Sequence, residues 1–162
     1  MTDNSARADF ARDVHLAVQA SRSFEHSCDA VFAAWTDERN FFVLRASAVS
    51  HEIIEIHAAG GHRCRQVHQV GSRRVEIESD VVESIPGVRE VSVGTSPTSQ
   101  SRETLSFEAR GAACRVTVRH EVVWRRRPSW LVRPLYARSY RRQIRAGLAI
   151  LATLLSTSRS DA

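Results

Sequence analysis

The sequence predicts an α+β fold in which a curved antiparallel sheet of seven strands wraps a long C-terminal helix, with two short helices after the first strand. Three observations support this prediction. Apolar residues recur with a period of two in residues 14–24 and again in residues 46–124, as expected of strands with one buried face. After Pro128 the apolar period becomes helical. A helix with one apolar stripe can bury that stripe only against the concave face of the sheet.

The N-terminal part of the chain predicts one strand followed by two short helices. Every second residue from Val14 to Ala20 is apolar, which is typical of a half-buried strand, and we extend it over residues 14–24. Ser27 can cap a short helix, and a second helical segment is predicted for residues 37–44.

Residues 46–124 predict six strands in an antiparallel meander. The turn signals that separate the strands are Gly60-Gly61, Gly71-Ser72, Pro86-Gly87, residues 94–101 and Arg110-Gly111. The clearest strand is 114–124, where apolar and polar residues alternate and His120 falls on the buried face. The segment 94–101 is interpreted as a loop that can serve as a lid or as a plain surface connection.

The C-terminal segment predicts a helix of about twenty residues with two distinct sides. Its apolar side carries Tyr136, Tyr140, Ile144, Leu148, Leu151 and Leu155. Its opposite side carries Arg138, Arg141, Arg142 and Arg145. Residues 122–160 hold nine arginines and no acidic residue, so the net charge of +5 is concentrated there.

A length of 162 residues suits one domain, which we assign to residues 14–156, between a polar lead-in (1–13) and a tail (157–162). No secretory apolar region follows Met1, and the longest apolar run is too short to span a bilayer. We therefore expect a cytoplasmic protein.

Two segments carry a resemblance to a known family. The first is S-C-D-A-V-F-A-A-W-T-D at residues 27–37, and the second is T-L-S-F-E-A-R-G-A-A-C-R-V-T-V at residues 104–118. They resemble the entry segment and the penultimate hairpin of the START-like superfamily, also called SRPBCC or polyketide cyclase/dehydrase and lipid-transport proteins. The resemblance covers about residues 14–156 and implies a helix-grip fold with an apolar pocket between sheet and helix. Val75-Glu76-Ile77-Glu78 stands where aromatase/cyclases of this family carry a W-x-W pattern.

The predicted pocket contains candidate residues of two kinds. His120 and His68 are the candidate catalytic groups, because imidazole titrates near neutral pH, although polar core histidines are the more common case. The candidate ligand-binding residues are Cys64, Ile77, Ser79, Phe107, Val118, Tyr136 and Tyr140.

We expect no metal and no cofactor. His62, Cys64 and His68, together with His57, suggest a metal cluster at first sight. His62 and His68 lie about 20 Å apart on an extended strand, so that strand alone cannot chelate an ion, and a site would need His120 or another strand to converge on Cys64 or His68. Gly60-Gly61 lacks a phosphate-cradling pattern. The cysteines form no CxxC pair, and buried free thiols are expected.

Three functions remain open from the sequence. The first is binding or transport of an apolar or aromatic small molecule of lipid or polyketide type. The second is a cyclase or dehydratase acting on polyketide-like intermediates in the same pocket. The third is docking of an acidic partner on the arginine side, either an acyl carrier protein or an anionic membrane surface, with nucleic acid the least favoured.

Overall fold

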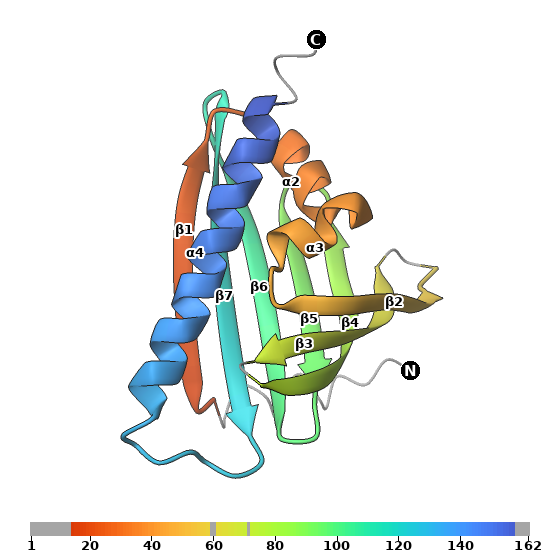
Figure 1. The fold of residues 1–162 in the computed structure, drawn as a ribbon. Coiled ribbons are helices and arrows are strands. Elements are labelled where there is room, and N and C mark those ends of the chain that lie inside the picture. The colour runs from red at the N-terminus through yellow and green to blue at the C-terminus, as the bar shows by residue number, and fades with distance from the viewer. Residues whose placement is uncertain (1–13, 59–60, 71, 158–162) are drawn as a thin grey trace.

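The structure is a computed structural model that describes residues 14–58, 61–70 and 72–157, so the expected lead-in 1–13 and most of the expected tail lie outside the described residues. Seven strands and a long last helix form the fold (Figure 1). The elements are β1 (Leu16–Phe24), α2 (Cys28–Thr36), the 3-10 helix η1 (Glu38–Asn40), α3 (Phe41–Leu44), β2 (Ala48–Ile56), β3 (His62–Val70), β4 (Arg73–Ile85), β5 (Arg89–Thr95), β6 (Ser99–Arg110), β7 (Ala113–Trp124) and α4 (Arg133–Thr157).

The strands form one antiparallel sheet in the order β1-β7-β6-β5-β4-β3-β2, so the predicted meander is confirmed and β1 extends it beside β7. In β7 the buried residues alternate with exposed or half-buried ones, as the sequence pattern predicts. Bulges between Ile53 and Glu55 in β2 and between Val81 and Glu83 in β4 shift the register. Such bulges bend and twist the strands, which helps the sheet to curve around α4.

Helix α4 crosses the concave side of the sheet over β1 and also contacts α2 and α3 (Figure 1). Its buried residues are Ile144, Gly147, Leu148, Leu151 and Leu155. Gly147 permits a close approach, because a Cβ atom there would lie 3.1 Å from the carbonyl oxygen of Leu44. The prediction of Tyr136 as an inward residue is wrong: its side chain is 44% exposed, because the first turns of α4 extend beyond the main core.

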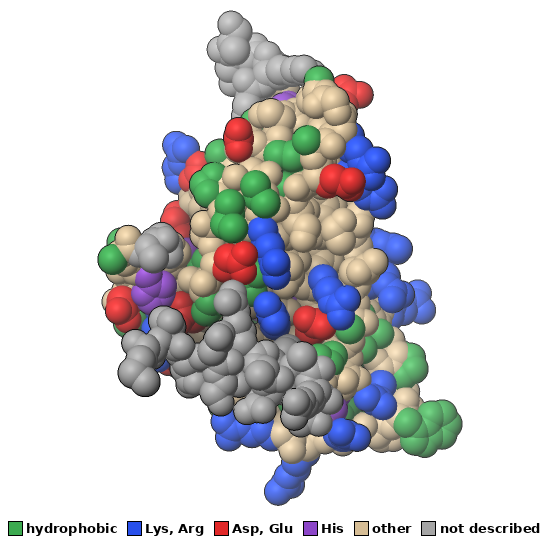
Figure 2. All heavy atoms as spheres, turned by 180° about the vertical axis from the view of Figure 1, so that it is seen from behind, with side chains coloured by type: hydrophobic (Ala, Val, Ile, Leu, Met, Phe, Trp, Pro, Cys, Tyr) green, Lys and Arg blue, Asp and Glu red, His purple; other side chains and the backbone are tan. Residues whose placement is uncertain are grey.

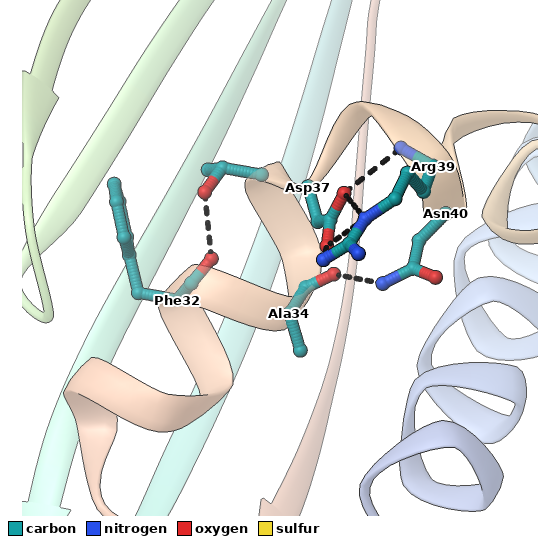
Figure 3. Close-up of polar contacts among 6 residues, drawn as sticks. Phe32, Ala34, Asp37, Arg39 and Asn40 are labelled. Atoms are coloured by element: carbon teal, nitrogen blue, oxygen red, sulfur yellow. Dashed lines mark hydrogen bonds and ion pairs between the residues drawn. The ribbon is translucent and has the colours of Figure 1, made fainter. Parts of the chain in front are cut away.

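The short segment between α2 and α3 is fixed by its own polar side chains (Figure 3). Ser27 caps α2, as predicted, by accepting a hydrogen bond from the backbone N–H of Ala30. At the other end, Asp37 accepts hydrogen bonds from the backbone and side chain of Arg39, and Asn40 donates to the carbonyl oxygen of Ala34. These contacts hold η1 against the end of α2 and thereby determine where Glu38 lies.

The predicted loop 94–101 is shorter in the structure. Strand β5 continues to Thr95 and β6 begins at Ser99, so only three residues connect them. Ser96 is buried, and its Oγ accepts a hydrogen bond from the backbone N–H of Ser99. This side-chain bond tightens the turn, which favours a plain surface connection over a lid.

The convex side of the sheet, seen in Figure 2, carries interspersed arginine and acidic side chains. Arg63 pairs with Glu78, and Arg65 pairs with Glu76, across β3 and β4. Among the described residues, no helix combines the length and hydropathy that a bilayer crossing requires.

All three cysteines are free thiols in this structure. The Sγ atoms of Cys28 and Cys114 lie 2.7 Å apart, where the start of α2 meets β7. Burial and the neighbouring Cys28 thiol raise the pKa of Cys114 to about 12, so this side chain remains protonated at neutral pH.

Candidate functional site

The candidate site is a cavity of about 60 Å³ between the short helices and the middle of the sheet. Residues of α2, η1 and α3 form one wall, and residues of β3, β4 and β5 form the other. Its ionisable lining residues are Asp37, Glu38, Arg45, His62, Cys64 and Glu90. The cavity therefore differs in place and chemistry from the apolar pocket predicted along the C-terminal helix, because the leucines of α4 fill the space above β1 and β7.

The predicted pocket residues on the strands all belong to the concave face, but only two of them line the cavity. Cys64 and Ser79 are opposite one another on β3 and β4 and contribute to its wall. Ile77 lies one step further along that face and is half-buried. Phe107 and Val118 are part of the hydrophobic core, where Phe107 contacts Phe32 of α2 edge to face at 5.4 Å.

The two predicted tyrosines of α4 lie outside the cavity lining. Tyr140 is half-buried and stacks on His120 with ring centroids 4.7 Å apart. Burial raises the pKa of Tyr140, so its phenol stays protonated under physiological conditions. Tyr136 packs on Trp124 at the far end of the helix, 5.4 Å between ring centroids.

His120, the first candidate catalytic residue, forms part of a small charged cluster. Its Nδ1 lies 3.6 Å from Oε2 of Glu103, and Arg45 Nη2 lies 3.8 Å from the other carboxylate oxygen. Burial raises the pKa of Glu103, but His120 and Arg45 outweigh this effect and hold the pKa below its usual value. Glu103 is therefore ionised and can orient His120 for proton transfer.

Glu90 is a lining residue whose pKa lies near neutral pH. Burial raises its pKa to about 7, against the opposing effect of the Arg45 charge. A carboxyl group with such a pKa can accept or donate a proton under physiological conditions. Sequence reasoning missed Glu90 and Glu103, although both share the inward face of their strands with Leu105.

His68, the second candidate catalytic residue, is held in a chain of hydrogen bonds. Ser47 Oγ lies 2.9 Å from His68 Nδ1, and His68 Nε2 lies 3.0 Å from Oε1 of Gln66. Burial and the Arg45 charge lower the pKa of His68, so the imidazole is neutral. With Nε2 donating to Gln66, Nδ1 accepts from Ser47, and the ring orients the Gln66 amide toward Cys64.

Cys64 and two histidines form a group of metal-ligating atoms. His51 from β2 joins His62 and Cys64 from β3, with one ligating atom of each within 4.8 Å of the others. Burial lowers the pKa of His51 and raises the pKa of Cys64, so the free protein holds a neutral imidazole and a thiol rather than a thiolate nucleophile.

Sequence reasoning considered His62, Cys64, His57 and His68 as ligands and missed His51. Periodicity alone does not reveal it. Equal steps from the Ile56–His62 pair would bring His51 opposite Val67, and the bulge between Ile53 and Glu55 brings it opposite Gln66, on the face of Cys64. His57 instead contacts Asp80, with 2.7 Å between Nε2 and Oδ1.

Comparisons with known proteins identify the fold. No protein-family model and no curated protein matches the sequence. TTHA0849 from Thermus thermophilus has a similar structure, with TM-score 0.75 and 17% identity over 88% of this chain and 99% of that one. A START superfamily protein from Mycobacterium smegmatis gives TM-score 0.71 and 10% identity over 87% and 97%. The Zhui aromatase/cyclase from a Streptomyces species gives TM-score 0.72 and 14% identity over 85% and 92%.

These similarities confirm the START/SRPBCC-type helix-grip fold that the sequence resembles. Identities at this level establish the fold alone, and fold does not determine function. The function must be argued from the cavity, its charged groups and the surface of this chain.

Proposed function

We propose that this chain binds or carries a small molecule on the concave face of its sheet, in the cavity beneath α2 and α3. The observation that carries the proposal is the convergence of polar groups from both walls on one cavity. Arg45 and Glu90 supply charge there, and Trp35 contributes an indole N–H that is buried without a hydrogen-bond partner among the described residues. Unpaired buried donors are costly, so a ligand that accepts this hydrogen bond gains affinity.

The ligand we propose has an apolar or aromatic body and several oxygen acceptors, as lipid-like and polyketide-like molecules do. Trp35 and Phe41 offer ring faces, and the Arg45 guanidinium lies 5.4 and 4.9 Å from their centroids. A cation over aromatic rings beside a titratable carboxyl suits a molecule that carries hydroxyl and carbonyl groups on a planar frame.

Binding of such a molecule requires the cavity to enlarge. A volume of about 60 Å³ equals roughly two water molecules in the liquid, whereas ligand pockets span about 300–1,000 Å³. The wall formed by η1 and α3 is the part that must move, because it consists of two short helices while the opposite wall is hydrogen-bonded sheet.

The first experiment is native mass spectrometry of the purified protein, followed by extraction and identification of any retained molecule. A displacement assay with 8-anilinonaphthalene-1-sulfonate then measures the site directly. We expect Ser92→Leu, which fills the cavity, to lower probe affinity at least about tenfold, an effect of about 1.4 kcal/mol. Ser106→Leu, on the exposed side of β6, is the matched control. Equal affinity in all three proteins would contradict binding in this cavity.

Catalysis is the second candidate function, and Glu90 is the observation that favours it. A carboxyl with a pKa of about 7 beside the Glu103–His120 pair supplies two proton-transfer groups on one face. The reaction class is dehydration or cyclisation of a polyketide-like chain. We expect Glu90→Gln to remove turnover, measured by mass spectrometry as loss of water from a β-hydroxy thioester, while ligand affinity is kept. Turnover that persists in Glu90→Gln and in His120→Ala would contradict these catalytic roles, and absence of turnover in the wild type would leave binding as the function.

The arginine side of α4 is proposed as a docking surface for an anionic membrane. Arg138, Arg141, Arg142 and Arg145 line a shallow surface groove. The β7–α4 connection adds Trp130, which is 76% exposed, together with other exposed apolar residues. Exposed aromatic and apolar groups beside arginines suit insertion at a lipid headgroup surface better than a purely acidic carrier protein. This arrangement agrees with a proposed cytoplasmic location.

A further inference from the structure

Three metal-ligating side chains from two neighbouring strands converge at one end of the cavity. His62 and Cys64 are two residues apart on β3 and therefore point to the same side of the strand. His51 of β2 is a diagonal neighbour of Cys64, which pairs with Ile53. One ligating atom from each of the three lies within 4.8 Å of the other two.

The His51 imidazole is buried and lies beside the carboxylate of Glu38. The His51 side chain is only 7% exposed, and both of its ring nitrogens are buried without a hydrogen-bond partner in the described part of the chain. Phe41 stacks on the imidazole, with ring centroids 3.8 Å apart and an angle of 30°. A buried imidazole that is held in position but makes no hydrogen bond is unusual in a folded protein, where buried polar groups are normally paired. A buried imidazole held beside a carboxylate in this way is positioned to coordinate a cation.

Glu38 supplies a fourth donor from outside the sheet. One carboxylate oxygen lies 2.9 Å from Nε2 of His51, and the other lies 3.7 Å from Nε2 of His62. The first distance is that of a close ion-pair contact. Glu38 begins η1, whose position is fixed by the Asp37–Arg39 and Asn40–Ala34 contacts drawn in Figure 3. The Glu38 carboxylate therefore lies beside both histidines, and the hydrogen-bonded turn that carries it fixes its position.

A hydrogen-bonding residue supports the sulfur atom. Gln66 donates from Nε2 to Sγ of Cys64 at 3.2 Å, and its own orientation is set by His68. Donors to the sulfur of a ligating cysteine and partners that orient the ligands are regular features of metal sites in proteins. The Ser47–His68–Gln66 chain thus has a role that does not require His68 to transfer protons.

We propose that Glu38, His51, His62 and Cys64 bind one Zn²⁺ ion. One thiolate, two imidazoles and one carboxylate are the donor types that zinc takes in tetrahedral sites. Bond lengths of about 2.0 Å to nitrogen and oxygen and about 2.3 Å to sulfur place such ligand atoms roughly 3.3–3.5 Å apart, so small side-chain movements close the site. Binding forms a zinc–sulfur bond and releases the thiol proton of Cys64 to solvent.

An ion at this position has a structural consequence. It joins η1 to the β2–β3 hairpin, which otherwise meet through the Glu38 contacts with the two histidines. Three of the four proposed ligands also line the cavity, so the ion fastens one end of the cavity wall. This inference does not depend on the proposed function, because the ligands are defined by the mutual distances of His51, His62 and Cys64 and by the contacts of Glu38 with the two histidines.

The test uses the whole chain, freed of any affinity tag and of metal, and titrates it with Co²⁺ as a spectroscopic substitute for Zn²⁺. We expect one Co²⁺ per chain, d–d bands of tetrahedral intensity and a near-ultraviolet thiolate-to-cobalt band. Zn²⁺ added afterwards should remove these bands, and equilibrium dialysis with elemental analysis gives its stoichiometry.

The variants assign the ligands. Cys64→Ser should abolish the thiolate band. His62→Asn, at a less buried position, should weaken Zn²⁺ binding more than tenfold, because loss of a residue that only orients a ligand already costs roughly tenfold in affinity. Cys28→Ser and His57→Asn are matched controls, because they remove a thiol and an imidazole outside the cluster. Circular dichroism checks that each variant folds.

The proposal fails if the wild-type chain takes up no stoichiometric Co²⁺ or Zn²⁺. It also fails if the bound cobalt shows no sulfur band, or if the control variants lose as much affinity as Cys64→Ser and His62→Asn. Binding of a small-molecule probe is measured separately in metal-free protein, so failure of the zinc site and failure of the proposed function give different results.

Discussion

The two halves of the concave face differ in what covers them. Over β1, β7 and the end of β6, the face is apolar and closed by α4 and α2, with Val116 and Leu151 fully buried. Over β3, β4 and β5, the same face carries Glu90, His68 and Cys64 around a small cavity. One curved sheet thus has a half that stabilises the fold and a half that holds titratable groups in partial burial, where their pKa values shift.

The covered half obtains its stability from apolar area removed from water. The open half carries polar groups that are costly to bury and are tolerated when they are paired or serve a ligand. Substitutions in the covered half should therefore lower the stability of the fold, whereas substitutions in the open half should mainly change ligand binding and its pH dependence.

The largest effect is expected in the covered half. Leu151→Ala should lower the free energy of unfolding by about 2–5 kcal/mol, because Leu151 is 0% exposed and its removal leaves a cavity. Ile77→Ala, at a half-buried position of the open half, should cost about 1 kcal/mol. Urea unfolding of both variants measures the contrast, and equal losses would show that the two halves contribute alike.

An intermediate effect is expected from pH acting on the open half. Burial raises the pKa of Glu90 from 4.5 to about 7, so the folded state prefers the protonated carboxyl. The stability that this preference contributes is complete below pH 4.5 and is lost as pH rises through 7.

Glu90→Gln should remove this loss and be more stable than the wild type at pH 8, by about 2 kcal/mol at most, since the carboxyl is only partly buried. Chemical denaturation between pH 5 and pH 8 measures the difference. Glu83→Gln, on the neighbouring strand, is the control. A parallel pH dependence in wild type and Glu90→Gln would contradict the assignment.

The smallest effect on stability is expected on the arginine side of α4. Arg138→Glu with Arg142→Glu should change the free energy of unfolding by less than about 0.5 kcal/mol, because both side chains are exposed. Sedimentation with vesicles that contain phosphatidylserine should weaken at least about tenfold. Arg73→Glu with Arg74→Glu makes the same change in net charge on β4, and comparable weakening there would indicate a general charge effect instead of a docking surface.

The architecture could be predicted from the sequence because it depends on local periodicity. The alternation in β7 and the helical stripe ending at Leu155 specify which faces are buried. The turn signals between the apolar segments indicate how many strands there are. The predicted loop 94–101 is too long, because serines are common in linkers and do not by themselves indicate a tight turn. In the structure Ser96 makes the hydrogen bonds of a tight turn instead.

The site was harder to predict because it depends on which residues face each other across strands. The alternation predicts the buried face for His120 but leaves the inward face of residues 62–70, which include His68, open. The partners Glu103 and Gln66 follow from strand register. The meeting of His51 with Cys64 depends on a hairpin that contains a bulge, and a shift of one residue would turn His51 to the other face. Tyr136 was misplaced because helical periodicity does not reveal where the core beneath the helix ends.

Gly147 makes the size of the cavity sensitive to a position outside it. Any side chain there would press on the backbone of Leu44, at the end of α3, and come close to the ring of Trp35. Phe41 and Trp35 are both wall residues, so the push would pass through α3 into the lining. A substitution at residue 147 would therefore change the size of the cavity from the other side of the short helices. The accepted ligand size could then change while every lining residue stays the same.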